Sequence, residues 1–138
     1  LLEPSAAFLE TARAQLPAAR VRAMHTCGLQ DFMPEAGAAY AVVWMQWVLI
    51  YLTDDDLIAF LKRCAAALAA RGMLVVKESV SRAANGFYVD REDSSITRTD
   101  AHFRTIFARA GLRVVHSAMQ KGLPRGMFPV GMYALTPS

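Results

Sequence analysis

The chain has 138 residues, of which 54% are apolar and 20% are charged, so it is long enough for one domain with a hydrophobic core and too short for two. Its net charge of +3 is small and its basic residues are scattered along the sequence, which gives no support for the clustered basic face of a typical nucleic-acid-binding protein. The longest apolar stretch, residues 42–52, is interrupted by Gln46 and falls short of the roughly 20 residues of a membrane span, so we expect neither nucleic acid nor membrane as a partner.

Apolar runs and helical periodicity alternate along the chain and predict its elements. Helices are expected to begin after Pro4-Ser5, at Thr53 and at Thr99, since Ser and Thr are favoured at helix N-termini. The polar segment over residues 81–98 predicts a long functional loop. Short strands are expected over residues 1–3, 21–26, 40–45, 73–76, 112–118 and 130–136.

The helix that begins at Thr53 has the clearest pattern. Its apolar residues recur at helical spacing behind an acidic first turn, which is typical of an amphipathic helix. It is expected to end at Arg71-Gly72. The apolar residues are Leu57, Leu61, Cys64 and Leu68.

Strands that alternate with helices predict an α/β fold with a doubly wound, mostly parallel sheet. A short connection with Gly and Pro over residues 121–126 joins the last two strands and predicts an antiparallel hairpin at the C-terminus. We expect one domain over residues 1–138.

Polar side chains follow the first three predicted strands, at the edge where open α/β sheets bind ligands. Glu3 either accepts hydrogen bonds from ribose hydroxyls or is a solvated loop carboxylate. Gln30 either reads an adenine edge or belongs to an ordinary polar turn. Gln46 and Trp47, with a second tryptophan close by, indicate a pocket, although a lone tryptophan there more often belongs to the core.

Acidic and hydroxyl residues cluster within the predicted loop. They suit a cationic ligand or peptide, and the alternative is a solvated surface. The histidines have no carboxylate or cysteine at ligand spacing, so we expect no metal. Glycine-rich nucleotide loops, nucleophile elbows and zinc-protease motifs do not occur in the chain, so hydrolase and phosphotransfer functions have no local support. The cluster comprises Asp90, Glu92, Asp93, Ser94 and Ser95.

Several of these segments together resemble the protein α-N-terminal methyltransferases. The resemblance is carried by Cys-Gly-Leu-Gln-Asp-Phe at residues 27–32, Gln-Trp-Val at 46–48, and Asp-Ser-Ser at 93–95 followed by Arg98, in family order and at matching spacing. It implies a class I, Rossmann-like methyltransferase fold. It also implies methyl transfer from S-adenosylmethionine to the free α-amine of protein N-termini that begin Xaa-Pro-Lys/Arg, with such peptides as partners.

The same resemblance implies roles for individual residues. On the cofactor side, Glu3 holds the ribose, Leu29 and Gln30 lie at the adenine, and Gln46 lies near the methionine portion. The residues implied to bind the substrate peptide are Trp47, Ser79, Asp90, Ser95 and Phe128.

Asp93 and Tyr51 are the implied catalytic residues. A substrate α-amine has a pKa of about 7.7–8.0, so no strong base is required, and Asp93 is expected to orient the amine and accept its proton directly or through water. Tyr51 stands where the family has a histidine, Ser79 where it has an asparagine, and Gly126 where it has an acidic channel residue. These departures concern substrate preference and rate.

The family's first strand and its glycine-rich cofactor loop have no counterpart in the chain. We therefore expect the chain to be the C-terminal portion of such an enzyme and to be inactive alone. The alternatives are a small-molecule class I methyltransferase and a non-catalytic truncated partner of a full-length paralogue. Cysteines without a pairing pattern predict an intracellular protein, and the resemblance implies the cytoplasm, the nucleus or both.

Overall fold

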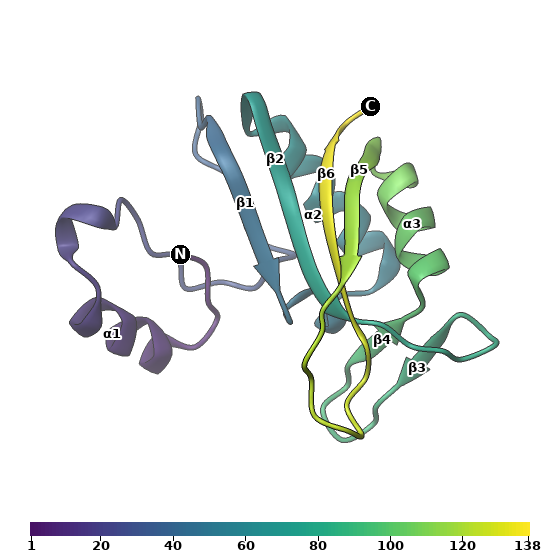
Figure 1. The fold of residues 1–138 in the computed structure, drawn as a ribbon. Helices are drawn as coiled ribbons and strands as arrows, with labels where there is room; N and C mark the ends of the chain where they lie inside the picture. Colours follow the sequence, from purple (N-terminus) through teal and green to yellow (C-terminus); the bar gives the residue numbers. More distant parts are fainter. The chain divides into compact units, whose positions relative to one another are not determined.

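The computed structural model describes all residues from Leu1 to Ser138, and they form two compact units, Leu1–Met33 and Pro34–Ser138 (Figure 1). The single domain expected over residues 1–138 stays a prediction. No helix is both long and apolar enough to span a bilayer.

The first unit contains the helix α1 (Ala6–Gln15) and the short 3-10 helix η1 (Ala18–Arg20). The strands predicted over residues 1–3 and 21–26 are wrong, because only a single parallel bridge, Leu2 to His25, forms between them. A strand needs a partner along its length, and the backbone N–H of Val21 instead donates to Ala18 in the turn of η1.

The second unit is built on a mixed four-stranded sheet in the order β1-β2-β6-β5. β1 (Tyr40–Gln46) pairs parallel with β2 (Leu68–Ser79). β6 (Val130–Pro137) pairs antiparallel with β2 and with β5 (Leu112–Met119). The α/β class and the antiparallel C-terminal hairpin are thereby confirmed. The sheet is mixed rather than mostly parallel, because β6 pairs antiparallel with both of its neighbours and only β1 and β2 are parallel.

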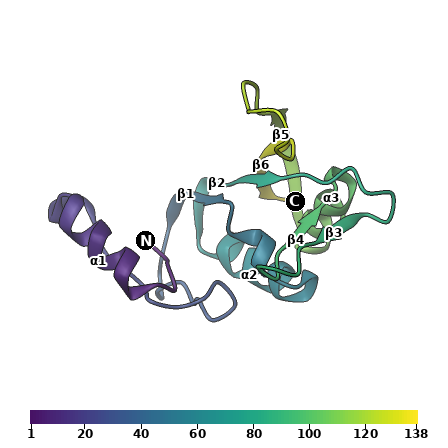
Figure 2. The same cartoon turned by 90° about the horizontal axis from the view of Figure 1, so that it is seen from below.

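Two helices, α2 (Asp54–Ala66) and α3 (Asp100–Arg109), lie against one face of this sheet (Figures 1 and 2). Both begin as predicted, since the hydroxyl of Thr53 accepts a hydrogen bond from the N–H of Asp56 and that of Thr99 from the N–H of His102. Their apolar faces form the core, with Leu57, Leu61, Cys64, Phe103, Ile106 and Phe107 all buried.

The end of α2 differs from the prediction. The helix stops at Ala66, and Leu68 already belongs to β2, paired with Tyr40. Gly72 lies inside β2, and the position requires glycine because a Cβ there would stand 2.5 Å from the carbonyl oxygen of Tyr40. Pairing with β1 therefore overrides the helical spacing that includes Leu68.

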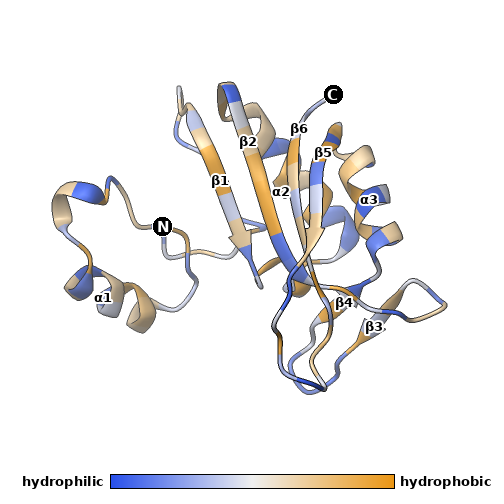
Figure 3. Ribbon diagram, in the orientation of Figure 1, coloured by the Kyte–Doolittle hydropathy of each residue, from blue (hydrophilic) through white to orange (hydrophobic).

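The segment predicted as a loop over residues 81–98 contains a two-stranded hairpin, β3 (Phe87–Val89) with β4 (Ile96–Arg98). The 3-10 helix η2 (Leu49–Tyr51) follows β1. Figure 3 shows hydrophobic residues along the middle of β1 and β2 and hydrophilic residues at the end of β2 that leads toward β3 and β4. The polar side chains therefore collect at the carboxyl end of the parallel pair.

Candidate active site

The turn after β1 carries Trp47 in an unusual backbone conformation. Trp47 has a φ of 52°, in the left-handed region that non-glycine residues rarely adopt. Its backbone N–H donates to the carbonyl of Lys77 on β2 at 3.1 Å, and the ammonium of Lys77 lies 5.5 Å from the centre of its ring. The indole is 40% exposed, so one part of the ring contacts a cation and another part faces solvent.

Glu78, near the end of β2, binds this turn through backbone hydrogen bonds. Its Oε1 accepts hydrogen bonds from the N–H groups of Val48 and Leu49, both at 2.8 Å, while its buried Oε2 has no hydrogen-bond partner. Burial raises the pKa of the Glu78 carboxyl to about 7, against the opposing effect of the backbone donors and of the Arg98 charge.

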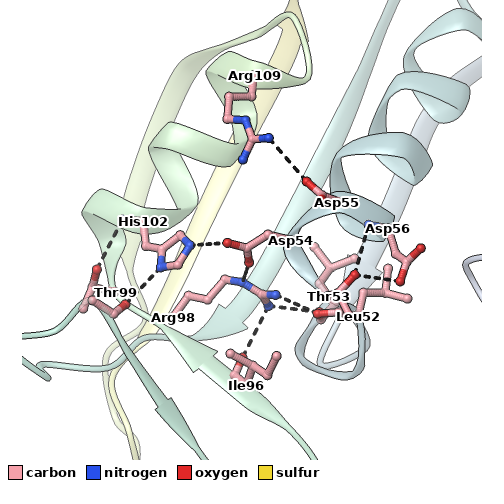
Figure 4. A network of polar contacts seen from close by, with 12 residues as sticks. Leu52, Thr53, Asp54, Asp55, Asp56, Ile96, Arg98, Thr99, His102 and Arg109 are labelled. Atoms are coloured by element: carbon pink, nitrogen blue, oxygen red, sulfur yellow. Dashed lines mark hydrogen bonds and ion pairs between the residues drawn. The ribbon is translucent and has the colours of Figure 1, made fainter.

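Arg98 is the second fully buried charge at this end of the sheet. Its Nε donates to Oδ1 of Asp54 at 2.7 Å, and its Nη2 donates to the carbonyl of Leu52 at 2.6 Å. The other oxygen of Asp54, Oδ2, lies 2.6 Å from Nε2 of His102, whose Nδ1 faces the carbonyl of Gly86 at 3.3 Å. Figure 4 shows Asp54 between the side chains of Arg98 and His102.

This arrangement sets the charge of Asp54. Burial raises the pKa of Asp54, but hydrogen bonds from His102 and Arg98 and the charge of Arg98 more than offset it, so the pKa lies below its ordinary value. Asp54 is therefore an ionised anchor that joins the starts of α2 and α3 to β4.

The loop of the β3–β4 hairpin is closed by its own polar groups. The N–H of Asp90 donates to the carbonyl of Ser95 at 2.9 Å. Oδ1 of Asp90 accepts from the N–H of Glu92, and Oδ1 of Asp93 accepts from the N–H of Ser95, both at 2.9 Å. Ser94, with a φ of 60°, is the second non-glycine residue in the left-handed region, and such conformations concentrate at functional sites.

Asp93 is exposed, and hydrogen bonds from the side chain and backbone of Ser95 hold its pKa below the ordinary value. A carboxylate with a lowered pKa is a weak proton acceptor. The geometry therefore favours Asp93 as a fixed negative charge that orients an amine over Asp93 as a strong base.

Three further predicted residues lie around the same edge. Ser79 is the last residue of β2 and pairs with Val130, and Tyr51 is exposed on η2. Phe128 contacts the ring of Tyr88 on β3, with ring centres 5.8 Å apart. It lines an open hollow with Arg82, Gly126, Met127 and Pro129, whose only charged side chain is a cation.

The remaining predicted residues belong to the first unit. Glu3 follows the bridge to His25, and its Oε1 accepts from the N–H of Ser5 at the start of α1, at 2.8 Å. Leu29 and Gln30 lie in the turn that follows the bridge. A Cβ on Gly28 would stand 2.5 Å from the amide of Gln30, so the glycine allows this amide to lie against the backbone.

Within the second unit, the structure thus brings Gln46, Trp47 and Ser79 to one sheet edge and connects the hairpin to that edge through Arg98. The sequence analysis predicted no role for Glu78 or Asp54, and it named Arg98 only as the end of a motif. One signal was available for Glu78. It follows Leu74 and Val76 at a spacing of two, which places it on the buried face of β2.

Comparisons with known proteins agree with this architecture. A family model described as AdoMet-dependent proline di-methyltransferase matches residues 1–136. The chain belongs to this family. It is 43% identical to the alpha N-terminal protein methyltransferase 1 of Arabidopsis thaliana, covering 99% of this chain and 50% of the relative, and 43% identical to that of Schizosaccharomyces pombe, covering 99% and 61%.

Solved structures show the same likeness. A SAM-dependent methyltransferase of Leishmania major superposes with a TM-score of 0.85 at 37% identity, covering 99% of this chain and 54% of that one. A SAM-dependent methyltransferase from Clostridium acetobutylicum, 9% identical with a TM-score of 0.74, covers 99% of this chain and 74% of that one and shares the fold. The chain therefore spans about half to three fifths of the length of the first curated relatives it matches.

Proposed function

We propose that the protein containing this chain transfers methyl groups from S-adenosylmethionine to the free α-amine of proteins that begin Xaa-Pro-Lys/Arg. Family membership supports the methyltransferase class, and a relative in Danio rerio, 39% identical, is named N-terminal Xaa-Pro-Lys N-methyltransferase 1. The observation that carries the proposal is the connection, through Arg98, of the turn bearing Trp47 to the loop bearing Asp90 and Asp93.

The residue types present suit the cofactor. In the first unit, the carboxylate of Glu3 is a suitable acceptor for ribose hydroxyls, and the Gln30 amide beside Gly28 is a suitable partner for an adenine edge. In the second unit, the amide oxygen of Gln46 accepts from Trp44 at 3.3 Å, which orients its amide nitrogen as a donor. When bound, S-adenosylmethionine supplies an electrophilic methyl group.

On the peptide side, the chain's residues orient an amine that needs little activation. An α-amino group with a pKa of about 7.7–8.0 is partly neutral near neutral pH. Asp93 orients this group through its fixed negative charge, and the proton that the amine loses passes to water. The ring of Trp47 lies beside the peptide, with the ammonium of Lys77 5.5 Å from its centre. Most of the rate acceleration then comes from alignment of the reacting groups.

The test uses the native protein purified from its own cells, radiolabelled S-adenosylmethionine, and a Ser-Pro-Lys peptide with a free amine. The matched control is the same peptide with an acetylated N-terminus. We expect label in the free peptide and none in the acetylated one. Equal labelling of both peptides, or labelling only of small neutral acceptors, would contradict the proposal and favour another class of methyltransferase.

A further inference from the structure

Two fully buried ionisable side chains, Glu78 and Arg98, hold the turn between β1 and α2. Leu49, in the middle of this turn, donates its N–H to Glu78 at 2.8 Å, and its carbonyl accepts from Nη1 of Arg98 at 3.4 Å. Glu78 and Arg98 are each 0% exposed. The two successive peptide units that meet at Leu49 are thus each bound to a buried polar side chain, and this fixes the backbone there because hydrogen bonds in the protein interior are strong.

Arg98 also ties this turn to the hairpin. It is the last residue of β4, and its carbonyl accepts from the N–H of Ser81 at 2.8 Å. Its guanidinium donates to the carbonyl of Ile96 in the same strand and to the carbonyl of Leu52 at the end of the turn. The side chain therefore runs from the hairpin to the turn, as Figure 4 shows.

The turn requires such support because of Trp47. A left-handed backbone conformation is unfavourable for a residue with a side chain, and it persists only where the surroundings fix it. Glu78 binds the two N–H groups that directly follow Trp47, those of Val48 and Leu49. Loss of these bonds would let the turn relax to other conformations.

We propose that Glu78 and Arg98 are positioning residues that fix the turn over residues 47–52 relative to the β3–β4 hairpin. They thereby set the spacing between Trp47 and the loop of Asp90 and Asp93. This inference rests on the proposed function, which assigns these two segments to the substrate peptide. It goes beyond that function because neither Glu78 nor Arg98 is expected to touch the peptide or the cofactor.

The first test measures peptide and cofactor binding separately in Glu78→Leu and Arg98→Lys. Leucine has similar bulk but accepts no hydrogen bond, and lysine keeps the charge near Asp54 but cannot also reach both carbonyls of the turn. Apparent affinity falls with the fraction of competent conformer, so we expect the KM for the Ser-Pro-Lys peptide to rise about tenfold, or about 1.4 kcal/mol, with an unchanged Kd for S-adenosylmethionine.

Two further variants serve as controls. Glu78→Gln keeps an oxygen acceptor for the turn and should restore the peptide KM to within about threefold of the wild type. Arg104→Lys alters an exposed ion pair with Asp100 on α3 and should leave KM unchanged. A wild-type KM in both Glu78→Leu and Arg98→Lys, or an equal loss of cofactor affinity, would overturn the proposal.

The second test does not depend on activity. These 138 residues contain two tryptophans, so Trp44→Phe leaves Trp47 as the only one among them, and acrylamide quenching measured on these 138 residues then reports on the turn. Trp47 is 40% exposed in the ordered turn, so its release in Glu78→Leu or Arg98→Lys should raise the quenching constant roughly twofold. If Glu78→Leu does not fold, Arg98→Lys carries both measurements.

The two tests fail in different ways. A native protein that methylates no Xaa-Pro-Lys peptide would contradict the proposed function, while the quenching experiment would still decide whether Glu78 and Arg98 fix the turn. An unchanged quenching constant in the folded variants would contradict the positioning role even in an active enzyme.

Discussion

The turn after β1 and the loop of the β3–β4 hairpin each contain one left-handed residue, Trp47 and Ser94, but different groups hold them. The turn is held by the fully buried side chains of Glu78 and Arg98. The loop is held by its own aspartates, which accept one exposed hydrogen bond, from the N–H of Glu92, and one half-buried hydrogen bond, from the N–H of Ser95. Exposed hydrogen bonds exchange readily with water and buried ones do not, so the turn should be rigid and the loop adaptable.

Arg98→Met tests the turn that buried side chains hold, and it is the variant with the largest expected effect. Methionine removes the donors to Leu49 and Leu52 and leaves the buried Glu78 without a nearby cation. Breaking a buried charge network in this way should lower the free energy of unfolding by about 3–5 kcal/mol, measured by urea denaturation.

Arg104→Met is the matched control for that measurement. Arg104 and Asp100 form an exposed pair on α3, and such pairs contribute about 0–1 kcal/mol. Equal destabilisation by the two variants would contradict the distinct role of the buried arginine.

The pH dependence of stability sharpens the same contrast. The pKa of Glu78 is about 7 in the folded protein, above its ordinary value of 4.5, so the folded state binds more protons than the unfolded state between these values. Stability should therefore fall as pH rises from 4.5 to 7, by about 3 kcal/mol for a shift of this size.

Glu78→Gln should remove this dependence, because an amide does not titrate. Asp54, whose pKa is lowered, contributes in another window, since its stabilisation is lost only as pH falls through the acid range. Urea denaturation at several pH values compares the two proteins, and parallel curves for wild type and Glu78→Gln would contradict the assignment to Glu78.

Asp93→Asn tests the exposed loop of the β3–β4 hairpin. The amide oxygen can still accept from the N–H of Ser95, so the free energy of unfolding should change little. Loss of the charge that orients the amine should lower turnover about a hundredfold, with cofactor affinity unchanged. An unaltered methylation rate would remove Asp93 from the reaction.

Local patterns predicted the elements whose signals lie within the element. Thr53 and the apolar spacing from Leu57 to Cys64 identify α2, and the short connection over residues 121–126 identifies the C-terminal hairpin. The end of α2 could not be predicted in this way. Leu68 satisfies the helical spacing, but its pairing with Tyr40 places it in β2, and that pairing depends on a strand distant in sequence.

The residues of the candidate site also differ in how far the sequence alone could predict them. Trp47, Asp90 and Asp93 could be predicted as site residues from sequence because their motifs are short and contiguous, and their roles stay predictions. The supporting pair, Glu78 and Arg98, is separated by a whole hairpin, and only folding brings both residues to Leu49. Burial and hydrogen bonding reveal such residues, whereas a linear pattern shows only a charge in a strand.

The measurement that tests the account most directly is the location of the transferred methyl group in a Ser-Pro-Lys peptide treated with the native protein and S-adenosylmethionine. Tandem mass spectrometry separates fragments that contain the N-terminal nitrogen from those that contain the lysine side chain. The account predicts added methyl mass only on the N-terminal fragment. Methylation of the lysine side chain, or no methylation of the peptide, would contradict it.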